Sequence, residues 1–517
     1  MSNYVKTTRI PNRTQNFASG RYCIGKVLEL RGCAWERMLD ILGRSQPTDG
    51  KTVECARQIC MLASSSRGGS SVTAELLQWQ GANCSDASSR LLTLPGEEKP
   101  HLILAGLAFP TREERFDDLN EADAKKSPVS KLLLEMESEI GHPIPYCDNL
   151  QLYATQLYRR LLLQWPKDLA ELEIKDAIRR LAQALRISFP QGYRDSEDNR
   201  RQVLNACARC FPFIRPSFYD CGRVRVDADT TLLANGSWSI EETPFIMPPP
   251  WHNATIQDLE RGSLLLRDPS NAWRFSFWQA VFPRQRTEVL HLVRDPRESV
   301  QGLCDGWNYP FGFQTMPSDS ALAIHGYTDH SGLGGIEWKR HRLNFSICRT
   351  LSRKLLEEHQ QMSLVQVCAH QWKDAHESIL AEVERLKLPR AVVNFADLRK
   401  ATEKTFNIIC AAIRLEKSHS GVAYAKSFHD RWVMATTLAK RVSHERWKNS
   451  PFSEEIRALV SSCFFDDVSV KLGLGKMSST PLDAAPPDDE LVATRNSSAS
   501  SIGVPDEYVA EPNPSNA

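Results

Sequence analysis

The stretch Ser64-Ser65-Ser66-Arg67-Gly68-Gly69-Ser70-Ser71 says more about this chain than any other part of the sequence. It follows a short apolar run at 59–63, which is typical of a buried strand, and it leads into a helical pattern that begins at Val72. A strand, a glycine-bearing polar turn and a helix together direct backbone N–H groups and a helix N-terminus at one point, which is an arrangement that binds phosphate. The sequence therefore predicts an anion-binding loop.

The residue types in this loop suit an anion. Gly68 and Gly69 allow close approach of the backbone and a positive φ. Arg67 adds a fixed positive charge with several donors, and the hydroxyls of Ser70 and Ser71 either donate to anionic oxygens or cap the helix. The Gly-x4-Gly-Lys-Ser/Thr spacing of ATP-binding loops is absent. A plain serine- and glycine-rich surface loop is the competing interpretation.

A second junction between a strand and a helix lies at Arg294. Residues 287–293 are rich in aliphatic and β-branched residues and predict a buried strand, and Asp295 and Pro296 suit the start of a helix. With the strand and helix expected upstream, the region 263–307 reads as a βαβα unit. Arg294 then lies at the C-terminal end of a strand, where open α/β sheets place their ligands.

These stretches resemble the sulfotransferases that use 3′-phosphoadenosine 5′-phosphosulfate (PAPS). The likeness covers roughly 55–110 and 260–475 and rests on motifs in the same order. They are Arg67-Gly68-Gly69-Ser70-Ser71 for the 5′-phosphosulfate loop, Leu265-Leu266-Arg267-Asp268-Pro269 with Phe282-Pro283 for the lead-in to the second motif, His291-Leu292-Val293-Arg294-Asp295-Pro296-Arg297 for the 3′-phosphate motif, Val392-Val393-Asn394-Phe395-Ala396-Asp397-Leu398 for a late strand and loop, and Trp447-Lys448 near the end.

The resemblance implies a three-layer α/β/α fold with a central, mostly parallel sheet, that is, a P-loop NTPase-like sulfotransferase fold, here with a helical insertion. Helical periodicity at 150–165, 172–187 and 199–211 supports the insertion, which either caps the site or only buttresses the core. The expected organisation is a lead segment at 1–54, an α/β core at 55–110 and 261–475, the insertion at 111–260 and a disordered tail at 476–517.

The same resemblance implies roles for the nucleotide-binding residues. Arg67 would bind the bridging and sulfonate oxygens, and the backbone N–H groups of Gly68 to Ser71, with Ser66 beside them, would hold the 5′-phosphate. Arg294 would hold the 3′-phosphate. Gly302 stands where family members usually carry a serine for this phosphate, and Ser299 lies one helical turn earlier. Either Ser299 substitutes for that serine, or backbone N–H groups and Arg294 suffice.

A general base is needed to take a proton from the acceptor, and family members use a histidine or a glutamate. Glu97 is the first candidate, because we expect it to precede a strand near 102–104 and to overhang the anion loop. The adjacent Glu98 would point elsewhere in an extended segment. His252 and His101 are the alternatives. The competing interpretations are a solvated Gly-Glu-Glu turn and a packed histidine.

Composition narrows the class of protein. The 517 residues carry 64 basic and 63 acidic side chains, net +1, without the basic excess that a nucleic-acid-binding protein of this size would show. No apolar run is long enough to span a membrane and no secretory signal begins the sequence, so we expect a cytoplasmic protein. The pair Cys207 and Cys210 has metal-like spacing but lacks a second pair of ligands, so we expect no metal.

The sequence leads to three alternative hypotheses for the function. The first is a sulfotransferase that binds PAPS and its product 3′-phosphoadenosine 5′-phosphate (PAP), with an unidentified hydroxyl or amine acceptor and a gating loop at 308–336. The second is a small-molecule kinase, in which Asp295 would hold Mg²⁺, although the loop lacks the expected lysine. The third is a non-catalytic protein that retains the fold. The sequence does not determine the oligomeric state.

Overall fold

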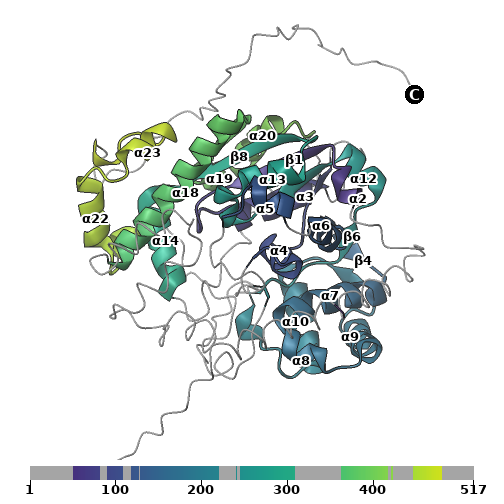
Figure 1. Ribbon diagram of the computed structural model, residues 1–517. Helices are drawn as coiled ribbons and strands as arrows, with labels where there is room; N and C mark the ends of the chain where they lie inside the picture. The colour runs from purple at the N-terminus through teal and green to yellow at the C-terminus, as the bar shows by residue number, and fades with distance from the viewer. Residues whose placement is uncertain are drawn as a thin grey trace, which may run out of the picture.

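The computed structural model describes Glu29 and residues 51–81, 90–108, 118–126, 129–219, 240–241, 245–308, 363–416, 421–422 and 446–479. Within these ranges the centre of the molecule is a parallel sheet (Figure 1). Its strands are β1 (Gln58–Ala63), β2 (Leu91–Leu92), β7 (Ser263–Leu266), β8 (Arg286–Val293) and β9 (Arg390–Asn394).

The strand order places β1 in the middle of the sheet. The order is β2-β7-β1-β8-β9, and every neighbouring pair is parallel. From β1 the chain moves to one side for β2 and β7 and then crosses to the other side for β8 and β9. The direction of the connections thus changes between β1 and β8, and ligands of open α/β sheets bind beside the carboxyl ends of the strands at such a point.

Alternate residues of β1 face two different layers of helices, as the period of a strand requires. Ile59, Met61 and Ala63 belong to one hydrophobic cluster, and Cys60 and Leu62 belong to another. The helices that contribute to the first cluster include α4 (Lys99–Ala105), α6 (Val129–Glu137), α13 (Phe275–Val281) and α18 (Leu364–Leu386), whereas those of the second are α3 (Ser70–Gly81), α19 (Phe395–Lys400) and α20 (Thr402–Ala412). The expected three-layer α/β/α arrangement is confirmed.

One strand was wrongly predicted. The apolar residues 102–104 lie in helix α4, and the second strand of the chain is the short β2 that precedes it. The helix has a proline at its start, where Pro100 fits because its missing N–H costs little, and it ends at Gly106, which adopts a left-handed φ of 84°. Because the run is fully buried, its hydrophobicity could not distinguish a strand from a helix. Glu97 therefore follows a strand and precedes a helix.

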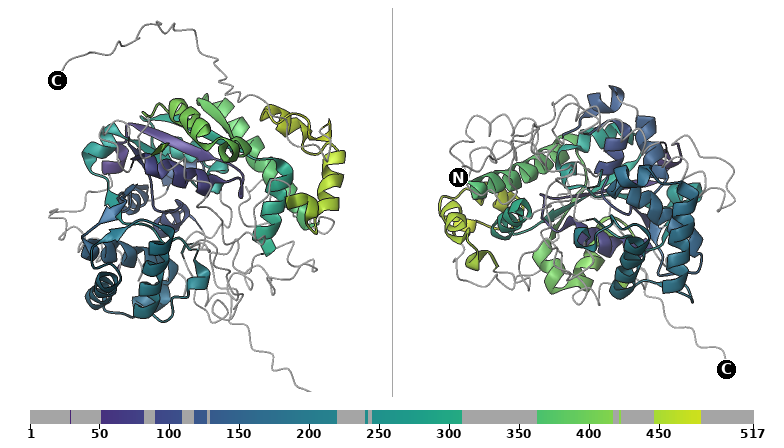
Figure 2. Two further views of the ribbon diagram at one scale, coloured as in Figure 1. Left: turned by 180° about the vertical axis from the view of Figure 1, so that it is seen from behind. Right: turned by 90° about the horizontal axis from the view of Figure 1, so that it is seen from below.

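The described residues between α4 and β7 are mostly helical. Its helices are α5 (Glu121–Lys126), α6, α7 (Leu150–Gln164), α8 (Pro166–Ala170), α9 (Ile174–Ser188), α10 (Glu197–Cys210), η2 (Pro216–Phe218) and α12 (Ile256–Arg261). Two small antiparallel pairs join them, β3 (Gly141–Pro143) with β6 (Trp251–Asn253) and β4 (Tyr146–Cys147) with β5 (Tyr193–Arg194). Figures 1 and 2 show α7, α8, α9 and α10 as one group beside the sheet layers.

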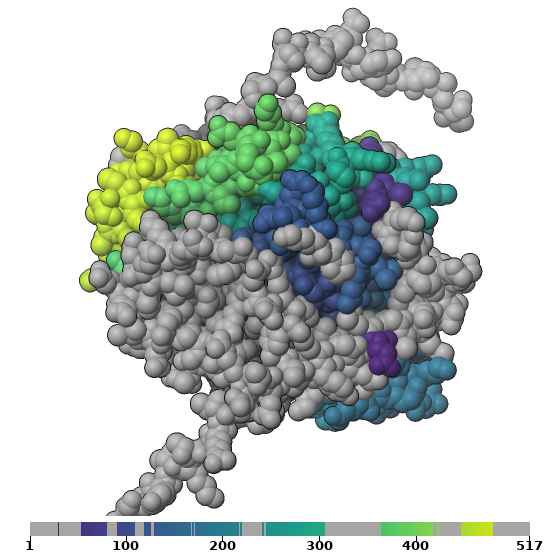
Figure 3. Space-filling view, in the orientation of Figure 1, coloured from purple at the N-terminus to yellow at the C-terminus, as the bar shows by residue number. Residues whose placement is uncertain are grey.

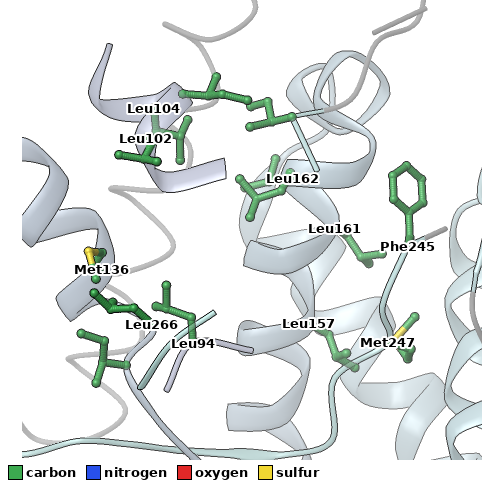
Figure 4. Packing of buried hydrophobic residues seen from close by; sticks show 14 of the residues in the cluster. Leu94, Leu102, Leu104, Met136, Leu157, Leu161, Leu162, Phe245, Met247 and Leu266 are labelled. Atoms are coloured by element: carbon green, nitrogen blue, oxygen red, sulfur yellow. The ribbon is translucent and has the colours of Figure 1, made fainter. Parts of the chain in front are cut away.

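This helical region shares its hydrophobic core with the sheet. A single cluster of buried side chains extends from β1 and β7 through α4 and α6 into α7, α9 and α10. Figure 4 shows Leu94 and Leu266 beside Met136 of α6, while Leu157 and Leu161 of α7 lie toward Phe245 and Met247. The shared core means that the insertion and the sheet pack as one body, because separating them would expose this apolar surface to water.

The C-terminal helices form a third cluster with the helix that follows β8. This cluster combines α14 (Pro296–Asn308), α18, η6 (Arg446–Asn449), α22 (Ser453–Ser461), α23 (Asp466–Lys471) and η7 (Met477–Ser479). Figure 3 shows α18 in green next to the yellow C-terminal helices on the visible face. The short elements α2 (Lys51–Glu54) and η3 (Pro269–Trp273) complete the described part.

Within the described ranges, none of the helices has the length and apolar run that crossing a membrane would take. Residues 309–336 of the expected gating loop, 480–517 of the expected tail and most of the lead segment 1–54 lie outside the described residues. The late strand expected at 392–398 is confirmed as β9, but the residues expected to form a loop after it begin helix α19, because Asn394 caps the helix by accepting from the N–H of Ala396.

Substitution of Leu62 tests whether the stability of the fold depends on the packing of β1. Its side chain is 1% exposed and packs with α3 and α20, so Leu62→Ala should lower the free energy of unfolding by about 2–5 kcal/mol. Urea denaturation measures this loss. Leu134→Ala, on the 38% exposed Leu134 of α6, is the control and should stay within about 0.5 kcal/mol of the original protein. A similar loss in both variants would show that β1 is not the centre of the cooperative core.

Candidate functional site

The loop between β1 and α3 folds back on itself immediately after the strand. The N–H of Gly68 donates to the carbonyl oxygen of Ser65 at 3.0 Å, and the N–H of Thr73 donates to the carbonyl oxygen of Gly69 at 3.0 Å, which begins α3. Arg67 adopts a left-handed φ of 62° and Gly69 a φ of 100°. A left-handed conformation costs a non-glycine residue on the order of 1 kcal/mol, and such strain is concentrated at functional sites.

Both glycines are needed for close packing, but only one adopts a positive φ. A Cβ atom on Gly69 would lie 2.4 Å from a ring carbon of Phe395, which follows β9, and a Cβ atom on Gly68 would lie 2.8 Å from the carbonyl oxygen of Ser65. We expected the positive φ at Gly68 and Gly69. The structure instead gives it to Arg67 and Gly69, so the arginine itself takes part in the turn.

Buried hydroxyl groups line the start of this loop. Ser64 and Ser65 are buried, and neither Oγ has a hydrogen-bond partner among the described residues. Ser70 is also buried, while Ser66 and Ser71 are half-buried. A buried hydroxyl without a partner costs about 1–3 kcal/mol, so these groups are polar positions that a bound anion would satisfy. The sequence motif indicates Ser66, Ser70 and Ser71 as anion ligands but not Ser64 and Ser65, the two serines nearest the strand.

Arg294 lies directly beside this loop. Because β1 and β8 are parallel neighbours with Ala63 opposite His291, both strands end at the same edge of the sheet. The Nη1 of Arg294 donates to the carbonyl oxygen of Arg67 at 3.0 Å, and its guanidinium lies over the ring of Phe395 at 5.3 Å. The structure therefore brings together the two arginines that the sequence analysis selected.

Helix α14 supplies the next residues of the site. Ser299 is fully buried, and its Oγ has no hydrogen-bond partner in the described part of the chain. A Cβ atom on Gly302 would lie 3.3 Å from the Cβ of Arg67 and 3.7 Å from the Nη1 of Arg294. Gly302 thus allows α14 to approach the loop, and a serine at this position would crowd Arg67.

Two further arginines extend the positive charge, and the sequence analysis did not select them. Arg399 in α19 and Arg446 in η6 both have a lowered pKa, caused first by burial and also by the charge of Arg294. Arg446 pairs with Asp305, and Arg399 interacts with Glu298. Arg399 directly follows the motif at 392–398, and Arg446 directly precedes Trp447. Their position beside these motifs is the sequence signal that could have identified them.

These arginines gather beside two acidic side chains of the described part of the chain. Glu298 accepts from the Nε of Arg294 at 3.1 Å and Asp305 pairs with Arg446, while Arg67, Arg294, Arg399 and Arg446 bring four guanidinium groups to the region. Arg297 is a separate case, since its Nη2 lies 2.6 Å from Asp295 in a pair of its own. The positive charge gathered at the ends of β1, β8 and β9 favours an anionic ligand.

The two glutamates after β2 have different environments. Glu98 is fully buried and accepts from the backbone N–H of Arg267 at 2.6 Å and from the Nδ2 of Asn271 at 3.1 Å. Burial, followed by the charge of Asp268, raises its pKa to about 7. Glu97 is half-buried and follows β2, a strand that ends at the same edge of the sheet as β1 and lies two strand spacings, about 10 Å, from it.

The structure does not bring His252 to the loop. Its Nε2 lies 3.9 Å from Asp258, which pairs with Arg90. Asp258 precedes β7 and Arg90 precedes β2, so both lie where these strands begin rather than where they end. The ring of His252 packs against that of His142. His101 is buried in α4 with its Nε2 3.3 Å from Glu139. Of the two candidate histidines, His101 is packed in the core, whereas His252 is exposed and lies in β6 beside Asp258.

No metal site is visible in the described ranges, where no group of three or more His, Cys, Asp or Glu side chains has a suitable arrangement. Cys207 is buried and Cys210 is half-buried within α10. No family model matches the chain, and no match is found among curated proteins or solved structures. The functional assignment therefore depends on the geometry of the site and on the motifs.

The buried carboxyl of Glu98 predicts a pH-dependent stability. The native protein retains the proton between about pH 4.5 and about pH 7, where the unfolded chain has lost it, so the free energy of unfolding should fall as the pH rises through this interval. The total change should be on the order of 3 kcal/mol. Urea denaturation at several pH values measures it.

Glu98→Gln should flatten this component of the pH dependence, since the amide does not titrate. Glu97→Gln is the matched control, because it leaves the contacts of Glu98 with Arg267 and Asn271 in place. An equal slope in the original protein and in Glu98→Gln would mean that Glu98 is ionised throughout, and it would return Glu98 to the list of candidate bases.

Proposed function

We propose that this protein is a sulfotransferase that moves the sulfuryl group of PAPS to a hydroxyl or amine of an acceptor. The observation that supports this most directly is the hydrogen bond from Arg294 to the carbonyl oxygen of Arg67. It joins a phosphate-type loop after the central strand to an arginine after the neighbouring strand. Two such anion sites side by side suit a ligand with two separate phosphate groups, which distinguishes PAPS from ordinary nucleotides.

The first site fits the 5′-phosphosulfate end. Gly68 and Gly69 let the loop pack tightly against Ser65 and Phe395, and the N-terminus of α3 contributes a partial positive charge. The hydroxyls of Ser64 and Ser65 are buried without partners among the described residues, and Arg67 adds a formal charge. Phosphate oxygens accept hydrogen bonds from groups of these types. The N–H groups of Gly68 to Ser71 would hold the 5′-phosphate.

The second site fits the 3′-phosphate. Arg294 would hold this group, and the Ser299 hydroxyl, which is buried one turn into α14, would donate to it. Arg399 and Arg446 add positive charge from α19 and η6. We propose that Ser299 takes the place of the serine expected at position 302, because a side chain on Gly302 would crowd Arg67.

The chemistry requires positioning and charge stabilisation rather than a covalent intermediate. PAPS supplies the sulfuryl group and leaves as PAP when its S–O bond to the 5′-phosphate breaks. Arg67 would stabilise the negative charge that develops on the departing phosphate oxygen. Glu97 would accept the proton of the acceptor as its oxygen or nitrogen bonds to sulfur, since Glu97 lies at the same edge of the sheet and is half-buried.

Calorimetry with PAP tests the proposal. The original protein should bind PAP and show little binding of ATP with Mg²⁺. Arg294→Ala should weaken PAP binding by about 10- to 100-fold, since it removes a charge-assisted hydrogen bond worth about 1.5–3 kcal/mol. Arg297→Ala is the matched control because Arg297 pairs with Asp295, and its affinity for PAP should stay within about threefold.

The other outcomes separate the alternatives. Binding of ATP with Mg²⁺ in preference to PAP would favour the small-molecule kinase. Binding of neither nucleotide would favour a non-catalytic protein that retains the fold. An equal loss in Arg294→Ala and Arg297→Ala would show that the motif contributes general positive charge rather than a specific phosphate contact.

Ser299 offers a test with two readouts. Ser299→Ala removes a buried hydroxyl that has no partner in the described structure, so the ligand-free protein should be at least as stable as the original. Its stabilisation by PAP should nevertheless decrease, with affinity about 5- to 10-fold lower. Thermal melts with and without PAP measure both effects. A purely structural Ser299 would instead give a lower melting temperature without ligand and an unchanged shift with it.

A further inference from the structure

Glu298 is a carboxylate inside the positively charged cluster, and the proposed function gives it no role. Its side chain is 11% exposed and lies 3.1 Å from the Nε of Arg294, one helical turn away. The charged groups that face it come from three segments: Arg294 and Asp295 before α14, Arg399 in α19 and Arg446 in η6. Among the described residues, Glu298 is thus the carboxylate in direct contact with the arginine that would hold a phosphate.

Ionisation of the Glu298 carboxyl is unfavourable in this environment. Burial raises the pKa of Glu298, and the neighbouring Asp295 raises it further, whereas Arg294 and Arg399 lower it. The arginines do not fully compensate for the loss of water. The carboxylate is thus held ionised mainly by its contact with Arg294, and it is sensitive to any other negative charge that arrives there.

A phosphate at Arg294 would be such a charge. It would share the guanidinium with Glu298 in a site that excludes most water, so the two anions would repel each other. Arg294 offers five N–H donors, of which Nε already serves Glu298 and Nη1 serves the Arg67 carbonyl. Protonation of Glu298 removes the repulsion and leaves the guanidinium charge to the ligand.

We propose that Glu298 is a positioning residue whose protonation is coupled to the binding of a phosphate group at Arg294. In the ligand-free protein it holds Arg294 in place as an internal counter-anion. When the phosphate binds, the carboxylate takes up a proton from solvent and the phosphate becomes the principal partner of Arg294. The inference rests on the proposed function for the identity of the ligand, while the coupling itself concerns any phosphate.

Calorimetry with PAP in two buffers of different ionisation enthalpy, at the same mildly acidic pH, tests the coupling. The original protein should take up protons on binding. Glu298→Gln mimics the protonated carboxyl, so it should lose most of this uptake and bind PAP about tenfold more tightly. Asp295→Asn is the comparison variant: it removes a neighbouring charge that also raises the pKa of Glu298 but keeps the Glu298 carboxyl, so it should reduce the uptake without abolishing it. Comparing variants removes the contribution of the ligand's own phosphates.

Three results would overturn one or both proposals. If PAP binds but Glu298→Gln retains the uptake or binds more weakly, the coupling is wrong and the proposed function stands. If PAP does not bind the original protein, inorganic pyrophosphate is the second probe. Tighter pyrophosphate binding by Glu298→Gln would then support the coupling while the proposed function fails. If neither probe binds either protein, both proposals are wrong.

Discussion

The hydrogen bond between the Arg294 guanidinium and the Arg67 carbonyl is the contact on which the site depends. It joins residues 227 positions apart in the chain at 3.0 Å. The contact exists because β1 and β8 are parallel neighbours in register, so the segments that follow them leave the sheet at the same edge. The intervening helical region can be large because it packs on one face of the sheet and places no strand between these two.

Small residues set how closely the elements of the site approach. Gly69 allows the ring of Phe395 to lie against the loop, and Gly302 allows α14 to lie against Arg67. A glycine inside a helix costs about 1 kcal/mol relative to alanine, so Gly302 is best explained by this contact. The glycine at 302, where the proposed function leads us to expect a serine, therefore has a structural reason. The reason lies in the conformation of the loop, where Arg67 itself takes the left-handed position.

Charge and burial act together at the ends of β1, β8 and β9. The arginines come from four different segments, and the partly buried positions of Arg399 and Arg446 lower the pKa of each. Nearby hydroxyls at Ser64, Ser65 and Ser299 are buried without partners among the described residues. Such unsatisfied polar groups are costly in a core, and an anionic ligand would satisfy both the charges and the hydroxyls.

The sequence by itself determined the local features: the strand, turn and helix around Arg67, the strand and helix around Arg294, and the helices at 150–165, 172–187 and 199–211. These depend on periodicity and turn residues within a few positions of one another. It could not determine that 102–104 is helical, because a fully buried run has no polar face to reveal its period. Only the tertiary structure decided that Arg399, Arg446 and Glu298 surround Arg294, and that His252 lies elsewhere, since strand order and register bring distant segments together.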